Sequence, residues 1–368
     1  MSIPQIVVRN LSKTYRVPER EAGLIASIQS LWARKYRNVE AVRDISFSIA
    51  AGEIVGFLGP NGAGKTTTLK MLSGLLYPTA GEVRVAGFVP WKREPAYLQR
   101  ISMVFGNKSQ VLWDIPPKDS FRVMGEIYHV PLCNLSRMLD ELVELLDMHA
   151  LLAKPVRTLS LGERMKCELV AALLYQPKVL FLDEPTLGLD LSMQQRFRHF
   201  IAEYNRLYGA TIILTSHYMA DIVALCPRVI VINHGSLLYD GSLQKLACQL
   251  APSKVLRLII SDEYTQVNPD LTFPTGVEVL AHEGASWTLS VPQAKVPTVA
   301  ASLLNNFPIV DLAIEDPPIE TVVNQVYQWS PSPHLTGGID AGTQEEQELF
   351  RNENVGVPVT GNSQGGER

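Results

Sequence analysis

The sequence predicts an α/β protein whose first domain contains a helical insert and is followed by a small α+β domain. Three observations carry this prediction. Strand-like apolar runs alternate with helical stretches over roughly the first 245 residues, which is typical of a layered α/β domain. A glycine-rich segment at residues 59–66 separates a strand from a helix. A second set of strand and helix patterns begins near residue 252.

The first domain is expected over residues 1–246. Apolar spacing between residues 116 and 176 is helical rather than strand-like, which predicts a helical subdomain at about residues 108–176. A helix is also expected to begin at Lys65. The predicted strands of this domain are residues 6–9, 45–49, 54–58, 83–85, 101–105, 179–182, 211–214 and 229–233.

The second domain is expected over residues 252–329. Its predicted strands are residues 255–260, 277–281, 287–291 and 310–314, and its predicted helices are residues 297–304 and 319–327. Residues 330–368 are rich in Gly, Pro, Thr, Gln and Glu and poor in apolar side chains. We therefore expect a disordered acidic tail there.

Composition indicates a globular protein and excludes nucleic acid as the default partner. The 368 residues and 40.7 kDa suffice for about two or three domains. Hydrophobic residues make up 46%, enough for a sizeable core. Lysine and arginine number 33 against 37 acidic residues, so the formal net charge is −4 and the basic excess of a duplex-binding protein is missing.

Cysteine spacing and the lengths of the apolar runs bear on the cellular setting. The start of the chain lacks the features of a secretory signal, and the apolar runs fall short of the roughly 20 residues that cross a bilayer. Any membrane association is therefore expected at the surface. The cysteines lie far apart without a CxxC pair, which predicts buried thiols in a reducing cytoplasm rather than a zinc site or disulfides: Cys133, Cys167, Cys226 and Cys248.

The strongest motif, GxxxxGK[ST], lies between the strand at 54–58 and the helix that follows. Its glycines let backbone N–H groups surround a β-phosphate, and the helix N-terminus adds the positive end of its dipole. Lys65 would reach the β- and γ-phosphate oxygens, and Thr66 would bind Mg²⁺. The predicted nucleotide-binding residues of this segment are Gly59, Pro60, Asn61, Gly62, Ala63, Gly64, Lys65, Thr66 and Thr67.

Two adjacent acids end the strand at 179–182 and form a second motif. Neighbouring side chains diverge at a strand end, so Asp183 would hold Mg²⁺ while Glu184 would orient or deprotonate the attacking water. Acids also follow apolar strands merely as solvated loops. The phosphate loop nevertheless favours a nucleotide site, and hence a P-loop NTPase core.

A third motif, Leu159-Ser160-Leu161-Gly162-Glu163-Arg164, opens a predicted helix about twenty residues before the second motif. Ser160 is a suitable N-cap for that helix. Since Glu163 follows three residues later, the segment can also be interpreted as a capping box alone.

The order of these motifs resembles the ATP-binding subunits of ABC transporters over roughly residues 3–245. LSLGE is similar to the LSGGQ signature of that family, with Leu161 and Glu163 as departures and Ser160 and Gly162 retained. The resemblance implies an ABC ATPase that binds ATP and Mg²⁺, with Glu184, His217 and Lys65 as catalytic residues.

Three further residues match positions of the family. Asp190 resembles the D-loop acid, His217 resembles the switch histidine, and Tyr15 resembles the aromatic residue that stacks on adenine. Each has a simpler interpretation: a helix cap for Asp190, a hydrogen-bonded strand-end residue for His217, and a core residue for Tyr15. Their joint order favours the family roles.

One position departs from the family. Members usually carry glutamine just after the strand that corresponds to residues 101–105, where this chain has Asn107. Asn107 would reach Mg²⁺ or the attacking water with a shorter arm, and Gln110 would fill this role if the loop register shifts. The two alternatives stay open, and hydrolysis slower than usual is one expected consequence.

The resemblance implies nucleotide binding between two subunits that face head to tail. Ser160 and Gly162 of one chain would contact the γ-phosphate held by Lys65 of the other, so ATP would join the subunits and hydrolysis would release them. The implied partners are a second ATPase subunit, identical or paired, and a polytopic membrane permease. The protein would be peripheral, at the cytoplasmic face of the plasma membrane.

The second domain and the long 13–42 region resemble those of ABC exporters of drugs and polysaccharides, which favours export over import without specifying the substrate. The alternatives are a soluble single-cassette ABC ATPase in an assembly or regulatory role, and a nucleotide sensor without turnover.

Residues 20–38 are expected to form an amphipathic helix with a basic end. Its apolar side chains either pack on its own domain or meet the membrane subunit or lipid headgroups. These side chains are Leu24, Ile25, Ile28, Leu31, Trp32 and Tyr36.

Overall fold

The computed structural model describes residues 4–18, 36–106, 109–250, 253–261, 273–274, 276–317, 321–323 and 326. It divides into two compact units, with the division between Gly241 and Ser242. Helix α9 (Leu243–Leu250) therefore falls in the second unit. The predicted domain limits at residues 246 and 252 stay predictions, and the predicted tail at 330–368 lies outside the described residues.

A six-stranded sheet, ordered β5-β6-β7-β3-β8-β9, forms the centre of the first unit. β3 (Ile54–Leu58) lies between β7 (Thr211–Thr215) and β8 (Arg228–Asn233) and is parallel to both. β6 (Val179–Asp183) is parallel to β7 and to β5 (Ile101–Phe105). Strands β3, β6 and β7 are buried at every position, as expected for parallel strands covered on both faces.

A three-stranded antiparallel sheet, ordered β2-β1-β4, packs against helix α2 (Lys65–Leu72) and the central sheet. Its strands are β1 (Pro4–Pro18), β2 (Tyr36–Ala50) and β4 (Ala80–Val85). One continuous apolar core joins the layers and includes Ile6, Phe47, Phe57 and Leu69. The phosphate-loop helix is thus held between two sheets.

The helix predicted over residues 20–38 is wrong at its end. Tyr36, Arg37 and Asn38 belong to β2 and pair with Pro18, Val17 and Arg16 of β1. Backbone pairing across these two long strands outweighs the short helical pattern of the side chains. The remainder of that prediction, residues 20–35, lies outside the described residues.

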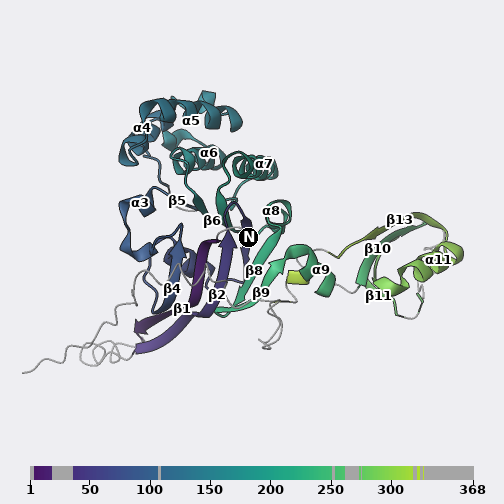
Figure 1. Ribbon diagram of the computed structural model, residues 1–368. Coiled ribbons are helices and arrows are strands. Elements are labelled where there is room, and N and C mark those ends of the chain that lie inside the picture. Colours follow the sequence, from purple (N-terminus) through teal and green to yellow (C-terminus); the bar gives the residue numbers. More distant parts are fainter. Residues whose placement is uncertain are drawn as a thin grey trace, which may run out of the picture. The chain divides into compact units, whose positions relative to one another are not determined.

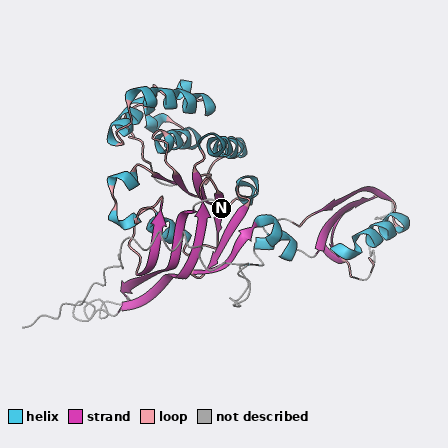
Figure 2. Cartoon of the chain, in the orientation of Figure 1, coloured by secondary structure: helices cyan, strands magenta, loops and turns pink. Residues whose placement is uncertain are grey.

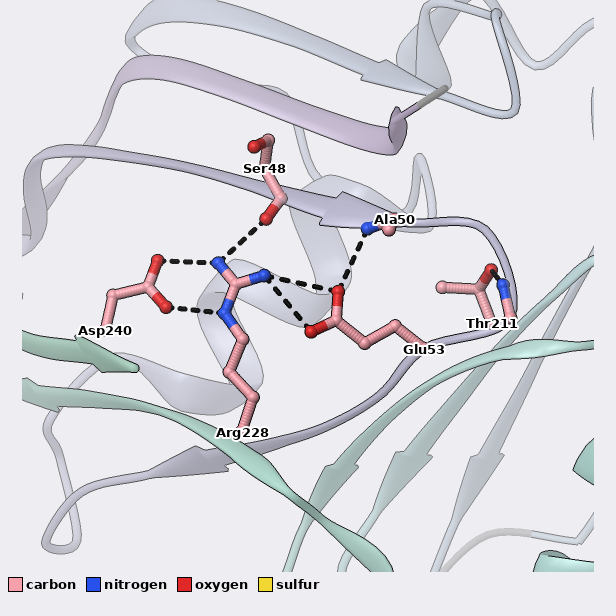
Figure 3. Close-up of polar contacts among 7 residues, drawn as sticks. Ser48, Ala50, Glu53, Thr211, Arg228 and Asp240 are labelled. Atoms are coloured by element: carbon pink, nitrogen blue, oxygen red, sulfur yellow. Dashed lines mark hydrogen bonds and ion pairs between the residues drawn. The ribbon is translucent and has the colours of Figure 1, made fainter. Parts of the chain in front are cut away.

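Arg228, at the start of β8, is fully paired with groups from both sheets. Its guanidinium donates to Asp240 at 2.7 and 2.8 Å, to both carboxylate oxygens of Glu53 at 3.2 Å, and to the carbonyl oxygen of Ser48 at 2.9 Å (Figure 3). Glu53 also accepts a hydrogen bond from the Ala50 N–H at 3.0 Å. Asp240 lies on β9 (Ser236–Ser242), so this Arg228 network joins β2, β8 and β9.

The helical insert is confirmed as α4 (Pro117–Ile127), α5 (Leu132–Leu145) and α6 (Leu161–Leu173), which group with α7 (Leu191–Tyr208) in Figure 1. The short helices α3 (Pro95–Leu98) and α8 (Met219–Leu225) also lie in the first unit. One buried carboxylate anchors the insert to the loop after β5: Glu168 of α6 accepts hydrogen bonds from the Ser109 hydroxyl at 2.6 Å and the Gln110 N–H at 2.8 Å. Burial raises the pKa of Glu168.

The second unit contains an antiparallel sheet, ordered β11-β12-β10-β13, with helix α11 (Val296–Asn306) along it (Figure 2). The core between them includes Leu258, Trp287, Val299 and Leu303. The predicted strands and the first predicted helix are confirmed. The strands are β10 (Ser253–Ile260), β11 (Glu278–Glu283), β12 (Ser286–Pro292) and β13 (Ile309–Glu315).

Two sequence-based expectations concern the cysteines and the membrane. Cys167 and Cys226 are buried thiols as predicted, but Cys133 is exposed, because it lies near the start of the amphipathic helix α5 on its solvent side. The side chain of Cys248 lies outside the described part. Among the described helices, none combines the length and the apolar character that crossing a bilayer requires.

Candidate nucleotide site

The phosphate loop connects the carboxyl end of β3 to α2, in the context that the motif predicts. Gly62 and Gly64 have φ angles of 80° and 106°, a region that favours glycine. A Cβ atom would lie only 2.4 Å from the carbonyl oxygen of Ile232 if added to Gly59, or of Ala41 if added to Gly64. The glycines therefore allow the loop to lie directly against β8 and β2.

Lys65, the first residue of α2, is 7% exposed and folds back under the loop. Its Nζ donates to the carbonyl oxygens of Gly59 at 2.6 Å and Pro60 at 3.1 Å. Burial lowers the pKa of Lys65, while the nearby carboxylates of Glu184 and Asp183 raise it. The ammonium is thus the principal cation at the loop and faces two acids.

Asp183 ends β6, in register with Thr215 at the end of β7. Its Oδ1 accepts hydrogen bonds from the hydroxyls of Thr215 at 2.8 Å and Thr66 at 3.3 Å. The strand order β6-β7-β3 produces this contact, because it brings the end of β6 to the start of α2 through a single intervening strand. A hydroxyl and a carboxylate at this distance fit Mg²⁺, which prefers few protein oxygens together with phosphates and water.

Glu184 diverges from Asp183 through a left-handed backbone conformation, with φ of 54°. Its N–H donates to the carbonyl and the hydroxyl oxygen of Thr215, both at 3.1 Å. The Nε2 atom of His217 lies 2.8 Å from Glu184 Oε1, and the two side chains are 42% and 25% exposed. Such non-glycine φ angles cost about 1–3 kcal/mol and cluster at active sites.

A cavity of about 210 Å³ opens where these groups meet. It is lined by Thr66, Lys70, Phe105, Gly106, Asp183, Glu184 and Leu187. A larger cavity of about 450 Å³ lies between α5, α6 and α7, but its lining is largely apolar and contains none of the predicted catalytic residues. We take the smaller cavity as the candidate site, since it holds the carboxylates and the hydroxyl that phosphoryl transfer requires.

The third motif forms a complete capping box at the start of α6. Ser160 Oγ accepts from the Glu163 N–H at 3.3 Å, and Glu163 Oε2 accepts from the Ser160 N–H at 2.8 Å. These hydrogen bonds lower the pKa of Glu163. The capping interpretation is therefore correct, and it leaves Ser160 exposed at a helix N-terminus.

The start of α7 lies next to the start of α6. Asp190 caps α7 by accepting from the Met193 N–H at 2.9 Å, which lowers the pKa of Asp190. A Cβ atom on Gly162 would lie 3.2 Å from Met193 Cγ, and one on Gly188 would lie 2.9 Å from Leu161 Cδ2. The signature segment and the predicted D-loop thus form one contiguous surface within the chain.

Three predicted nucleotide-binding residues do not line the cavity or lie outside the described part of the chain. Tyr15 is half-buried on β1, with the Lys13 Nζ 5.4 Å from its ring centre, so it is not a fully buried core residue. Gln110 donates from its side-chain amide to the Met103 carbonyl oxygen at 2.8 Å, and it does not line the cavity. Asn107 lies outside the described residues, so the choice between these two amides stays open.

Sequence reasoning missed several residues that support the site. Thr215 fixes both Asp183 and Glu184, and Glu168 anchors the loop after β5. The buried carboxylate of Asp221 forms an ion pair at 2.7 Å with Arg198. No motif marks them; only the position of Thr215 at the end of an apolar strand, beside the strand with two acids, offered a signal.

Family comparison agrees with this geometry. Residues 42–187 match the ABC transporter family, and residues 252–315 match the family described as "EvrA-like ABC transporter, C-terminal domain". The two matches fall in the two different units of the structure.

Several named proteins are similar in sequence. The ABC transporter ATP-binding protein NatA of Bacillus subtilis is 36% identical over 212 residues, covering 58% of this chain and 86% of NatA. The linearmycin resistance ATP-binding protein LnrL of the same organism is 30% identical over 228 residues, covering 62% of this chain and 73% of LnrL. The Nod factor export ATP-binding protein I of Ralstonia nicotianae is 33% identical over 228 residues, covering 60% of this chain and 68% of the relative.

Solved structures support the fold. An ATP-binding subunit of an ABC transporter matches with a TM-score of 0.56 and 23% identity, covering 67% of this chain and 92% of the other. A dimeric ATP-binding cassette in a post-hydrolysis state matches with a TM-score of 0.53 and 18% identity, covering 64% of this chain and 98% of the other. The chain therefore belongs to the ATP-binding subunits of ABC transporters, and it is an ATPase of the kind that drives them.

Proposed function

We propose that this chain powers an exporter, hydrolysing Mg-ATP in sites shared between two ATPase subunits that dock on a membrane permease. The observation that carries the proposal is one cavity lined by Thr66, Asp183 and Glu184. Lys65 lies next to it under the phosphate loop, and His217 lies 2.8 Å from Glu184. These side chains come from separate segments, and together they supply the cation, the metal ligands and the base that phosphoryl transfer requires.

Each residue has a defined task in this mechanism. Lys65 exchanges its contacts with the Gly59 and Pro60 carbonyl oxygens for phosphate oxygens. Thr66 and Asp183 would hold Mg²⁺, which would supply positive charge against the phosphate oxygens. Glu184 orients the attacking water and accepts its proton. His217, at 2.8 Å from Glu184, holds that carboxylate in place beside the cavity.

The second half of the site is supplied by a partner subunit in this proposal. Ser160 and Gly162 lie at the exposed N-terminus of α6, away from the cavity of their own chain. A helix N-terminus offers free N–H groups and a positive dipole end, which suit the γ-phosphate on a facing subunit. The dimeric cassette with a similar fold supports this arrangement.

Export is favoured by the names of the relatives. Similar proteins include ATP-binding subunits for linearmycin resistance, doxorubicin resistance and Nod factor export. We propose export of a small organic molecule through a permease, with this chain at the cytoplasmic face of the membrane. A single-cassette assembly factor is not favoured, because these relatives carry transport or resistance names.

Replacing Glu184 with Gln tests the catalytic assignment. The variant keeps Lys65, Thr66 and Asp183, so it should bind ATP but release phosphate on the order of 100-fold more slowly, and it should accumulate as an ATP-bound dimer. The measurements are phosphate release and the size of the complex with ATP. Turnover at the wild-type rate would contradict the role of Glu184, and the absence of turnover in the wild type would favour a nucleotide sensor.

A further inference from the structure

A fully buried carboxylate lies behind the Glu184 and His217 pair. Asp221, in the first turn of α8, has 0% of its surface exposed. Its Oδ2 accepts hydrogen bonds from the hydroxyls of Thr186 at 2.6 Å and Ser216 at 2.9 Å. Its Oδ1 accepts from Arg198 at 2.7 Å. We call these four residues the Asp221 cluster.

The two hydroxyls belong to the loops that carry the proposed catalytic pair. Thr186 follows Glu184 by two residues, and Ser216 directly precedes His217. The Ser216 hydroxyl also accepts from the N–H of Tyr218, on the other side of His217, at 3.0 Å. One carboxylate therefore binds the side chains of residues close in sequence to both partners of the 2.8 Å contact between Glu184 and His217.

Arg198 connects this cluster to α7. Its side chain is 16% exposed, and its charge balances that of Asp221, which an isolated buried carboxylate could not sustain. The N-cap of the same helix is Asp190, the predicted D-loop acid. A displacement of α7 would therefore move Arg198 and with it the partner of Asp221.

We propose that Asp221 is a positioning residue for ATP hydrolysis, which clamps Thr186 and Ser216 so that Glu184 and His217 stay at hydrogen-bonding distance. The inference rests on the proposed roles of those two residues. Charge-assisted hydrogen bonds define direction as well as distance, so the cluster holds two loops that apolar packing alone would leave free to shift. The polar contacts described for the cluster involve residues outside the phosphate loop, so we expect ATP binding to be largely independent of it.

The test is the double variant Thr186→Val with Ser216→Ala, which removes both hydroxyl donors and leaves the pair of Asp221 and Arg198 intact. Because small misplacements of catalytic groups cost up to about 100-fold, we expect kcat to fall roughly 10- to 100-fold. The Kd of ATP should change less than about twofold, since Lys65 and its loop are untouched. If the double variant fails to fold, each single substitution removes one donor and should give a smaller fall in kcat.

A second comparison separates positioning from general destabilisation. In a His217→Ala background, the double substitution should change kcat less than about twofold, because residues that act as one unit are not additive. Asp240→Asn is the matched control, since it weakens a partly buried arginine–carboxylate pair in the Arg228 network. This control should lower the melting temperature but leave kcat near the wild-type value.

Three results would overturn the inference. The first is a kcat of the double variant within about twofold of the wild type in a folded protein. The second is an equal fall in kcat with and without His217, which would indicate an independent structural effect. The third, unchanged turnover in Glu184→Gln and His217→Ala, would overturn the proposed roles as well. If those two variants are slow and the double variant is not, only the inference fails.

Discussion

The Arg228 network and the nucleotide site differ in the partners to which their charged side chains hydrogen-bond. In the Arg228 network every guanidinium nitrogen donates to an acceptor, and Glu53 and Asp240 both bind the same cation (Figure 3). At the nucleotide site, the Lys65 ammonium donates to carbonyl oxygens of its own loop, and Asp183 accepts hydrogen bonds from two hydroxyls, so both groups hydrogen-bond to uncharged partners. The first arrangement is closed and structural, whereas the second keeps charges available for a ligand.

This difference indicates how the two regions should respond to substitution. Removing one member of the closed network leaves a partner unpaired and should cost stability. Removing a charged side chain of the nucleotide site should cost little stability, because few native contacts are lost, but it deprives the nucleotide of a partner. The predictions that follow test this division, beginning with the largest expected effect.

Lys65→Met should abolish most ATP binding and slow hydrolysis on the order of 100-fold or more, because it removes the ammonium that lies under the loop. Its melting temperature without nucleotide should stay close to that of the wild type. Nucleotide titration, phosphate release and thermal unfolding provide the measurements. Lys178→Met, at an exposed lysine just before β6, is the matched control and should retain full activity. Wild-type ATP affinity in Lys65→Met would contradict the assignment of Lys65 to the nucleotide site.

Arg228→Met should lower the free energy of unfolding by about 3 kcal/mol, because Glu53 and Asp240 would be left without their shared cation. At temperatures where the variant is folded, kcat should be within about twofold of the wild type. Denaturant unfolding and phosphate release are the measurements. A large fall in kcat in the folded variant would contradict the claim that the Arg228 network contributes to stability and not to catalysis.

Glu163→Gln should cost roughly 0.5–1 kcal/mol, since glutamine keeps the capping geometry but loses the charge at the helix N-terminus. The pKa of Glu163 is lowered in the folded protein, so its ionised form contributes stability above the ordinary carboxyl pKa, and this contribution is lost as the pH falls through the folded value. The difference in stability between variant and wild type should therefore shrink under acid conditions. A pH-independent difference would argue against this origin.

The sequence was sufficient to predict elements and residues that are defined locally. The phosphate loop, the paired acids, the Ser160 cap and the apolar strands depend on short patterns, and the structure contains each of them. The Asp221 cluster could not be predicted, because it joins Thr186 to a residue 35 positions away and no spacing marks such a contact. Tyr36 and Cys133 were misjudged for the same reason, since strand pairing and exposure are set by the rest of the fold.

The central claim is that the cavity of one chain is completed by the Ser160 end of another. A mixing experiment tests it most directly, using one chain with Lys65→Met and another with Ser160→Arg, each inactive alone. The mixed dimer contains one site with an intact Lys65 and an intact Ser160. Our account predicts that phosphate release, absent from either variant alone, returns on mixing. If mixed dimers form and no activity returns, the shared site is contradicted.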